Sequence, residues 1–381
     1  MKILVVSPLA EPAHARQIPA ALAKHANVEV SVVAPEKSAT EAAYEASGWR
    51  RLDAGAQVNG FRLIPAALRN PANGAEGFAG DALERVMREM QPEVIQTWGG
   101  APDNHVAQLV RLKRRLCPRA KVVQYGFNNL PIRWRLRTTL KWRWLWRQMA
   151  AGIEANSEGI TVMREAGFRK PLERIFWGID TDEFRPMERA GLRERLGIQG
   201  EHIVGYVGRF VVEKGLRVLL EALKELPASV HALFIGAGPM QMELETAAAQ
   251  REWKGRLHVL PTVAPEKLAA YMNCCDAVAL ASLSTPHWKE QYGRVIGEAM
   301  ACGAVVVGSD SGAIPEVIGE AGLVAREGDA RALGQALGRA VFDASLRERL
   351  IAAGLARAEK ELSIRAMSGR LMEFYGRLLR G

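Results

Sequence analysis

The sequence predicts an α/β protein of two domains, each built on a parallel β-sheet with helices on both faces. Three observations predict this fold class. Short runs rich in Val and Ile alternate with helical segments, the alternation restarts after Pro186, and 381 residues suffice for two separate cores. Parallel sheets bind ligands beyond the carboxyl ends of their strands. We therefore expect two Rossmann-like domains that face each other across a ligand-binding cleft.

The first domain is predicted from apolar runs of strand length that are separated by helical segments. Strands are expected at 2–7, 28–33, 61–64, 94–97, 121–125 and 152–155. Helices are expected between them, at 13–25, 80–90 and 101–115. Glycine and proline at 177–180 and 184–186 mark the linker to the second domain.

The second domain repeats the same alternation. Strands are expected at 202–208, 230–235, 257–260, 277–279 and 304–308. Helices are expected at 215–224, 241–250, 265–274, 294–301 and 330–340. No internal sequence repeat and no low-complexity tract interrupts the two series.

The composition is that of an ordinary globular protein, with 48% hydrophobic and 24% charged residues. The apolar start of the chain is too short for a signal peptide, and no run approaches the roughly 18 apolar residues that span a bilayer. We therefore expect a soluble or peripheral protein of the cytoplasm. The cysteines form no C-x-x-C pair, which argues against a zinc site; they are Cys117, Cys274, Cys275 and Cys302.

The net charge of +9 comes from one segment of the chain. Residues 104–153 contain 12 Lys or Arg and no Asp or Glu, which leaves 39 basic and 42 acidic residues elsewhere. Within this segment, 131–149 combines cations with Trp at helical spacing. Three interpretations stay open: packing of the Trp side with solvated cations, docking on an anionic membrane surface, and, least favoured, nucleic-acid binding.

Two glutamates separated by seven residues form the sharpest motif, running from Glu290 through Tyr292, Gly293 and Arg294 to Glu298. The loop before the predicted helix offers backbone N–H groups and a helix N-terminus to an anion. Glu298 can accept hydrogen bonds from a ribose diol, and Glu290 can reach the hydroxyls of a sugar. Two isolated glutamates would be read as surface carboxylates, so the interpretation depends on the residues around them.

A second motif follows the strand predicted to end at Gly208. Arg209 and Lys214 flank a loop that opens a helix, and two cations beside a helix N-terminus suit a diphosphate. A third, weaker motif is the Gly-x-Gly at Gly236 and Gly238, which follows a strand and is equally typical of a tight turn.

Together these motifs resemble glycosyltransferase family 4, whose signatures are E-x(7)-E and Gly-Arg-x(4)-Lys-Gly. The resemblance is strong from about Gly152 to Glu316 and weak before it. It implies the GT-B fold and a retaining glycosyltransferase (a hexosyltransferase). It further implies an acceptor domain at 1–180, a donor domain at 181–362, and a last helix at 363–381 that crosses back to the first domain.

The resemblance also implies roles for individual residues. Arg209 and Lys214 bind the donor diphosphate, Glu290 positions the donor sugar, and Glu298 binds the ribose. The remaining donor-side candidates are Gly208, Gly236, Gly238, Tyr292, Gly293 and Arg294. No Asp-x-Asp motif lies in a donor-site context, so we expect no metal and no other cofactor. The expected donor is a UDP- or GDP-sugar. The expected acceptor is a glycan, lipid-linked or lipopolysaccharide-type molecule of cell-envelope synthesis.

The first domain departs from the family pattern at two places. The loop at 8–16 lacks the usual Gly-Gly pair, which leaves His14 and Arg16 as candidates near the phosphates. Gly126 occupies the place where many members carry a histidine, and Asn128 and Asn129 follow it as acceptor-side candidates or turn residues.

Two other classes of function remain open. One is a second enzyme class on the same fold, a nucleotide-sugar epimerase or a phosphorylase. The E-x(7)-E match argues against the epimerase, and the missing pyridoxal-phosphate lysine context argues against the phosphorylase. The other is a non-catalytic binding module that uses the basic, Trp-rich segment.

Overall fold

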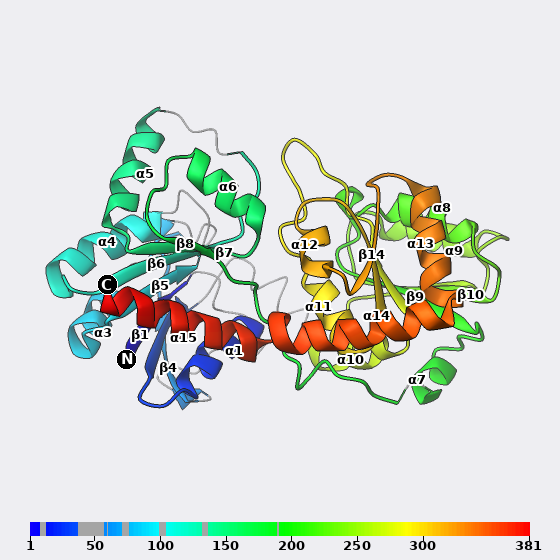
Figure 1. The fold of residues 1–381 in the computed structure, drawn as a ribbon, viewed down its shortest axis with the longest axis horizontal. Helices are drawn as coiled ribbons and strands as arrows, with labels where there is room; N and C mark the ends of the chain where they lie inside the picture. Colours follow the sequence, from blue (N-terminus) through cyan, green and yellow to red (C-terminus); the bar gives the residue numbers. More distant parts are fainter. Residues whose placement is uncertain are drawn as a thin grey trace. The chain divides into compact units, whose positions relative to one another are not determined.

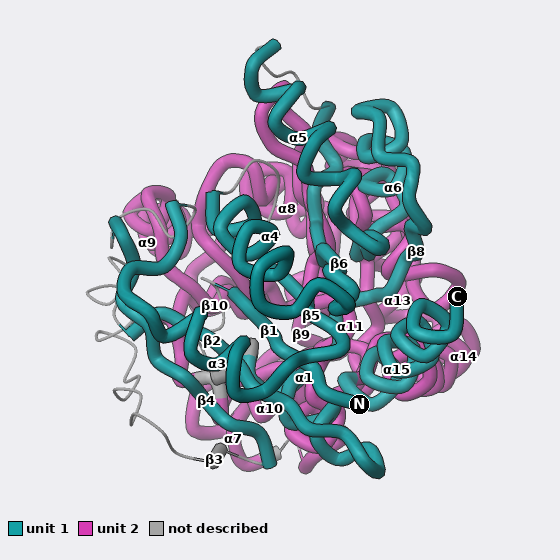
Figure 2. Tube along the Cα trace, turned by 90° about the vertical axis from the view of Figure 1, so that its left-hand side faces the viewer, with its two compact units in different colours: residues 1–178, 364–381 teal, residues 179–363 magenta. Residues whose placement is uncertain are grey.

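The structure, a computed structural model, describes residues 1–7, 13–36, 57–58, 60–70, 76–98, 104–131, 136–188 and 190–381. The chain divides into two compact units, which Figure 2 colours teal and magenta. Unit 1 comprises Met1–Gly178 and Ile364–Gly381, and unit 2 comprises Ile179–Ser363. The chain passes from unit 1 to unit 2 after residue 178 and returns to unit 1 after residue 363. The sequence predicted these two boundaries after residues 180 and 362.

Unit 1, which Figure 1 draws with several of its strands labelled, holds one sheet. Its strand order is β3-β4-β2-β1-β5-β6-β7-β8. Its described pairs are parallel except β3 with β4. The strands are β1 (Lys2–Val6), β2 (Glu29–Pro35), β3 (Gln57–Val58), β4 (Phe61–Ala66), β5 (Val94–Trp98), β6 (Lys121–Gly126), β7 (Ala151–Glu154) and β8 (Leu172–Arg174). The helices are α1 (Ala13–Ala23), α3 (Ala82–Met90), α4 (Asn104–Leu116), α5 (Leu136–Gln148), α6 (Ser157–Glu165) and α15 (Ile364–Arg380).

Burial explains why the inner strands of unit 1 could be predicted from the sequence. Val94–Trp98 is buried along its whole length, and β1 is buried after its first residue. Strands covered on both faces read as continuous apolar runs. The edge strand β8 is only half-buried, so its sequence carries no such signal and it was missed.

The last helix, α15, belongs to unit 1. The Tyr375 hydroxyl donates a hydrogen bond to Oε1 of Gln96 on β5, and both side chains are buried. Ser368 on α15 lies 2.8 Å from Nε2 of His25, the residue shortly after α1. These contacts join the two ends of the chain within one unit.

Unit 2 holds a fully parallel sheet with the strand order β11-β10-β9-β12-β13-β14. The strands are β9 (His202–Val207), β10 (Val230–Ile235), β11 (Leu257–Leu260), β12 (Ala277–Leu280), β13 (Val305–Ser309) and β14 (Gly322–Ala325). The helical segments are α7 (Ala190–Arg195), η2 (Val212–Lys214), α8 (Leu216–Lys224), α9 (Gln241–Ala249), α10 (Pro265–Asn273), α11 (Arg294–Ala301), α12 (Ile314–Ile318), α13 (Ala330–Phe342), α14 (Ala344–Arg357) and η3 (Ala358–Leu362).

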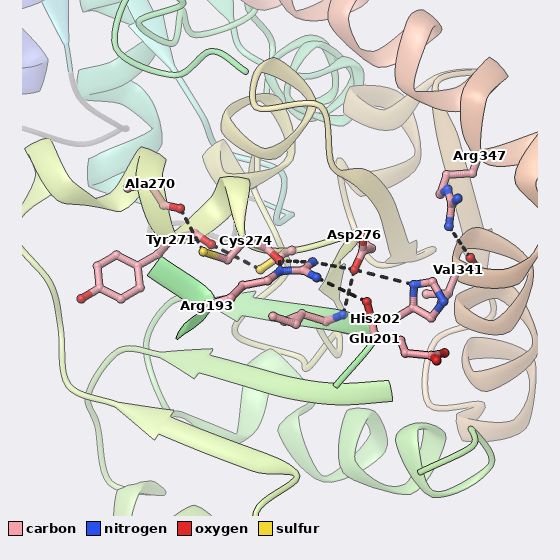
Figure 3. Close-up of polar contacts among 11 residues, drawn as sticks. Arg193, Glu201, His202, Ala270, Tyr271, Cys274, Asp276, Val341 and Arg347 are labelled. Carbon is pink, nitrogen blue, oxygen red and sulfur yellow. Dashed lines mark hydrogen bonds and ion pairs between the residues drawn. The ribbon is translucent and has the colours of Figure 1, made fainter. Parts of the chain in front are cut away.

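A charged cluster anchors α7 to the amino ends of β9 and β12 (Figure 3). Asp276 accepts hydrogen bonds from Arg193 at 2.8 Å and from the backbone N–H of Ile203 at 2.9 Å. Arg193 also donates to the Cys274 carbonyl. His202 lies 3.8 Å from the same carboxylate. The Asp276 carboxylate and the Arg193 guanidinium are thus held by contacts within unit 2, as expected of a structural cluster.

Candidate functional site

The strand order of unit 2 reverses between β9 and β12, which lie side by side at the centre of the sheet. In open parallel sheets, ligands bind beyond the carboxyl ends of the strands at such a reversal. The segments that follow these two strands are 208–215 and 281–293. The first contains Arg209 and Lys214, and the second contains Glu290 and leads into α11, which carries Glu298. The fold therefore places both charged motifs where a ligand is expected.

Lys214 and Glu290 form an ion pair at this position. Nζ of Lys214 lies 2.5 Å from Oε2 of Glu290, and Ser282 Oγ donates to the same oxygen at 2.8 Å. Only 14% of the Lys214 side chain and 9% of the Glu290 side chain are exposed. Nζ also lies 5.1 Å from the ring centroid of Trp288, within cation–π range. The fold thus joins two predicted residues that are 76 positions apart.

Gly215 explains why Lys214 can reach Glu290. It closes the η2 turn with φ of 66°, and a Cβ there would lie 1.8 Å from the Ala281 carbonyl oxygen. The Leu283 N–H also donates to the Glu213 carbonyl at 2.8 Å. Because position 215 has no side chain, the turn packs directly on the backbone that follows β12.

The second glutamate of the motif is held within its own helix. Arg294, the first residue of α11, donates to Oε1 of Glu298 at 2.7 and 3.2 Å. The Glu298 side chain is 6% exposed, and the pKa of neighbouring Glu183 is raised by burial and by nearby carboxylates, Glu298 among them. Gly293 caps α11 with φ of 73°, and Tyr292 before it is buried. Glu298 therefore lies in an acidic neighbourhood that Arg294 partly compensates.

Three of the four donor-side glycines lie together, namely Gly208, Gly236 and Gly238, and Gly236 and Gly238 each approach backbone atoms of the loop after β9. A Cβ on Gly236 would lie 1.9 Å from the Gly208 carbonyl oxygen, and one on Gly238 would lie 2.5 Å from the Phe210 carbonyl oxygen. The loops after β9 and β10 are also joined by a 2.8 Å bond from the Phe210 N–H to the Ala237 carbonyl. Gly236 and Gly238 are therefore required for loop packing, whatever else they contact.

Arg209 is exposed, and it lies close to a buried tyrosine that the sequence analysis missed. The Tyr206 hydroxyl donates to the Arg209 carbonyl at 2.7 Å. Burial raises the pKa of Tyr206, the Glu290 charge raises it further, and the Arg209 charge lowers it. Tyr206 thus lies within the electrostatic influence of both predicted residues.

A row of serines along the carboxyl ends of β12 and β13 was also missed. Ser309 Oγ donates to the Ser282 carbonyl at 2.6 Å. Ser284 donates to Glu327 from its N–H and its hydroxyl, at 2.6 and 2.7 Å, and its hydroxyl lies 2.9 Å from that of Ser311. Small polar residues directly after two buried strands were the available signal. This network holds the backbone from which Glu290 extends.

The described acceptor-side candidates of unit 1 are half-buried or buried. Asn128 is half-buried and closes a turn, with its amide donating to the Leu130 carbonyl at 3.2 Å. Asn129 is 2% exposed. Arg16 is half-buried in α1, and the side chain of His14 lies outside the described residues. The structure brings Asn128 and Asn129 to the carboxyl end of β6, beside a buried glutamate, Glu154.

Helix α5 settles how the basic segment packs. Three of its apolar side chains, Trp142, Leu145 and Trp146, belong to the core of unit 1, as does Met149 directly after the helix. The opposite face exposes Leu136, Leu140 and Trp144, at 74%, 56% and 37%, among exposed arginines. Positions 132–135 lie outside the described residues. The packing of the Trp side is confirmed from Trp142 onward. The opposite face of α5, which carries both apolar and cationic side chains, stays exposed.

Comparison with known proteins adds a family to this geometry. Residues 188–357 match the family model described as glycosyl transferases group 1. A D-inositol 3-phosphate glycosyltransferase of Xylanimonas cellulosilytica is 31% identical over 211 residues, which are 52% of this chain and 49% of that protein. The chain thus spans about half the length of that relative, and less of two other D-inositol 3-phosphate glycosyltransferases.

A second relative aligns over more of the chain. It is the GDP-mannose-dependent alpha-(1-6)-phosphatidylinositol monomannoside mannosyltransferase of Mycolicibacterium smegmatis, 28% identical over 78% of this chain and 79% of that protein. Among solved structures, Anabaena Alr3699/HepE in complex with UDP and glucose superposes with a TM-score of 0.73 and 19% identity, over 99% of this chain and all of that one. The two Rossmann-like units of the predicted GT-B fold are confirmed.

Proposed function

We propose that this chain, whose residues 188–357 match the model of the glycosyl transferases group 1 family and which has the GT-B fold, is a glycosyltransferase that uses a nucleotide-sugar donor. The observation that carries the proposal is the buried Lys214–Glu290 pair at the strand-order reversal of unit 2. The donor class, a UDP- or GDP-sugar, is supported by the GDP-mannose named for one relative and the UDP bound in one similar structure.

In the proposed reaction, the bond between the anomeric carbon and the diphosphate oxygen breaks, and the acceptor oxygen bonds to that carbon with retention. The acceptor proton leaves with the nucleoside diphosphate. Lys214 and Arg209 neutralise the charge that develops on the diphosphate, and Glu290 orients the sugar through its hydroxyls. Glu298 binds the ribose. Two cations supply the charge neutralisation, so the proposed transfer requires no metal ion.

Calorimetric titration with UDP, GDP and ADP in the presence of EDTA tests the donor site. We expect one nucleotide to bind in preference, and Arg209→Ala to weaken that binding by about tenfold or more, since a hydrogen bond to a charged group contributes about 1.5–3 kcal/mol. Lys224→Ala is the matched control, because Lys224 is a surface lysine of the same unit. A folded protein that binds none of the three contradicts the proposal.

Product analysis separates transfer from the alternative activities. Incubation with the preferred donor and a glycan acceptor is expected to give a glycosylated product with the donor's anomeric configuration. Epimerised nucleotide-sugar without any acceptor would identify an epimerase instead. A binding module would return the donor unchanged under both conditions.

The acceptor is proposed to be a glycan on a lipid or lipopolysaccharide, reached from an anionic membrane surface. None of the described helices is both long and apolar enough to cross a bilayer. The exposed face of α5 instead combines Leu140 and Trp144 with Arg137, Arg143 and Arg147. Cations attract anionic headgroups, and Trp with Leu favours the lipid–water interface.

A second basic feature lies at the C-terminal end of α5. A hollow of about 540 Å³ there is lined by Lys113, Arg119 and Lys121, with no acidic side chain among its lining residues. Burial lowers the pKa of Lys113, and the charges of Lys121 and Arg114 lower it further. Crowded cations of this kind are relieved by an anion such as a lipid phosphate.

Sedimentation with phosphatidylcholine vesicles, with and without phosphatidylglycerol, tests the membrane surface. The protein is expected to bind only the anionic vesicles and to be released by salt. Leu140→Glu is expected to reduce binding about tenfold or more, because it removes an apolar contact and adds a repelled charge. Met242→Glu is the control, since Met242 is 78% exposed on α9 of the other unit. Equal binding by both variants contradicts docking through α5.

A further inference from the structure

The Glu154 carboxyl group occupies the space that a side chain at position 126 would fill, at the carboxyl ends of the strands of unit 1. It ends β7 and pairs in register with Gly126, which ends β6. A Cβ on Gly126 would lie 2.6 Å from Oε1 and 2.8 Å from Oε2 of Glu154. A Cβ on Gly159 of α6 would lie 2.8 Å from Oε2. The carboxyl group therefore fills the space beside two glycines, where any other residue would displace it.

This carboxyl group is buried with one hydrogen bond. Glu154 is 1% exposed and accepts a hydrogen bond from the backbone N–H of Asn128. Its Oε2 has no hydrogen-bond partner within the described part of the chain. A lone buried carboxylate is costly, and a protonated carboxyl group needs a partner for its hydroxyl. Burial raises the pKa of Glu154 to about 8, against an ordinary value of 4.5.

The neighbouring charges do not offset this burial. Burial raises the pKa of Glu154, and the hydrogen bond from the Asn128 N–H lowers it in part. No charged group contributes to the pKa change. On β8 the register partner is Arg174, whose guanidinium lies 4.4 Å from the ring centroid of Phe176. On α6 the nearest titratable side chain in sequence is Glu158, in the first turn.

Glu154 and Asn156 together hold the loop 127–130. Asn156 Nδ2 donates to the Phe127 carbonyl at 3.3 Å, and the Ala155 N–H donates to the Gly126 carbonyl at 3.0 Å. A Cβ on Gly159 would lie 2.9 Å from the Asn128 carbonyl oxygen, so the loop also crosses closely over α6. The loop carries Asn128 and Asn129, the acceptor-side candidates, and it rests on the Glu154 carboxyl group.

We propose that Glu154 is a positioning residue: as a neutral acid it seats the loop 127–130, and this seating presents the half-buried Asn128 to the hydroxyls of a sugar acceptor. The acceptor part rests on the proposed function, whereas the seating does not. Ionisation leaves a buried charge without a cation, and water entry relieves it only if the loop lifts. Acceptor use is therefore coupled to the protonation of one buried side chain.

Hydrogen–deuterium exchange tests the seating without any substrate. Exchange of the peptide that contains 127–130 is followed from pH 6 to 9.5 and corrected for the intrinsic rate. Protection in the natural protein is expected to fall above about pH 8, approaching tenfold per pH unit. Glu154→Gln keeps an acceptor for the Asn128 N–H and is expected to stay protected throughout. Glu154→Ala is expected to lose protection at every pH.

Two controls make the result decisive. Glu158→Gln removes a carboxylate from the same edge and is expected to keep the pH dependence of the natural protein. Circular dichroism establishes that each variant is folded. If the natural protein and Glu154→Gln show the same pH dependence, the proposal is wrong.

The activity measurement separates this proposal from the proposed function. With donor and acceptor both present, the natural protein is expected to lose acceptor kcat/KM above about pH 8, and Glu154→Gln to retain it. Donor binding is expected to be unchanged in both, because the residues of the proposed donor site lie in unit 2. If exchange follows Glu154 but no transfer occurs with any donor, the proposed function fails and the seating stands. If transfer occurs but its pH profile is the same in Glu154→Gln, the coupling to the acceptor is wrong.

Discussion

Replacing Lys214 by alanine is expected to reduce kcat/KM for the proposed sugar transfer by about two to three orders of magnitude. The reason is electrostatic, since Nζ lies at the carboxyl end of β9 within 2.5 Å of Glu290 and is largely shielded from water. A preorganised cation in such a place stabilises leaving-group charge far better than a solvated one, and loss of one comparable donor costs roughly 10²–10³ in rate. The substitution also leaves the Glu290 carboxylate buried beside Ser282 without its cation.

Steady-state kinetics of donor turnover check this result, with Lys224→Ala as the matched control. Lys224 pairs with Glu221 and Glu252 at the surface of α8, where ion pairs contribute little, so its replacement is expected to leave kcat/KM within about twofold. Glu290→Gln keeps the side chain's shape but removes its charge. We expect its kcat/KM to lie between those of Lys214→Ala and Lys224→Ala. If Lys214→Ala retained more than a third of the natural kcat/KM, Lys214 would have no substantial role in the reaction.

Sequence patterns predicted the inner architecture because burial leaves a mark on the sequence. Strands such as β12, and β1 after its first residue, are covered on both faces and read as unbroken apolar runs. The edges are different: β14 has only four residues, Gly-Leu-Val-Ala, of which only the last is buried, and so short an apolar run does not distinguish a strand from a loop. The missed edge strands β8 and β14 are therefore strands that are partly exposed.

The site was predicted as motifs, and only the fold could join them. Lys214 and Glu290 belong to separate segments, and their contact depends on Gly215 packing against Ala281, a tertiary fact without a local signal. The glycines at 236 and 238 were considered for a ligand approach, yet their immediate neighbours are the carbonyls after β9. Ser282 and Tyr206 were missed because a serine after a strand and a tyrosine within one are both common.

Glu154 had a signal that the sequence analysis did not use. A glutamate stands at the end of the apolar run at 151–155, where a side chain becomes buried on folding. Such a residue either has a cation or holds its proton, and local sequence does not decide between the two. The decision depends on Gly126 and Gly159, whose missing side chains leave room for the carboxyl group but supply no charge.

Replacing Glu154 by glutamine is expected to stabilise the protein at neutral and alkaline pH. The pKa of Glu154 is raised from 4.5 to about 8 in the folded state, so the folded state holds a proton that the unfolded chain has released. This group's contribution is full below about pH 4.5 and is lost as the pH rises toward 8. The loss is about 3 kcal/mol at pH 7 and approaches roughly 5 kcal/mol above pH 8. Glutamine does not titrate, so its variant avoids that loss.

Calorimetric unfolding at pH 5, 7 and 8.5 measures the difference. We expect little change in melting temperature near pH 5 and an increase of several degrees for Glu154→Gln at pH 8.5, since unit 1 is of a size at which 1 kcal/mol corresponds to about 2–4 °C. Glu158→Gln is expected to leave the pH dependence unchanged. A variant less stable than the natural protein at pH 8.5 would mean that the folded state pairs Glu154 with a cation, Arg174 being the nearest by register. The loop would then be held by a charge pair and not by a neutral acid. The opposite result would mean that the chain retains a carboxyl group at a site where an amide is more stable, as expected when such a group serves activity.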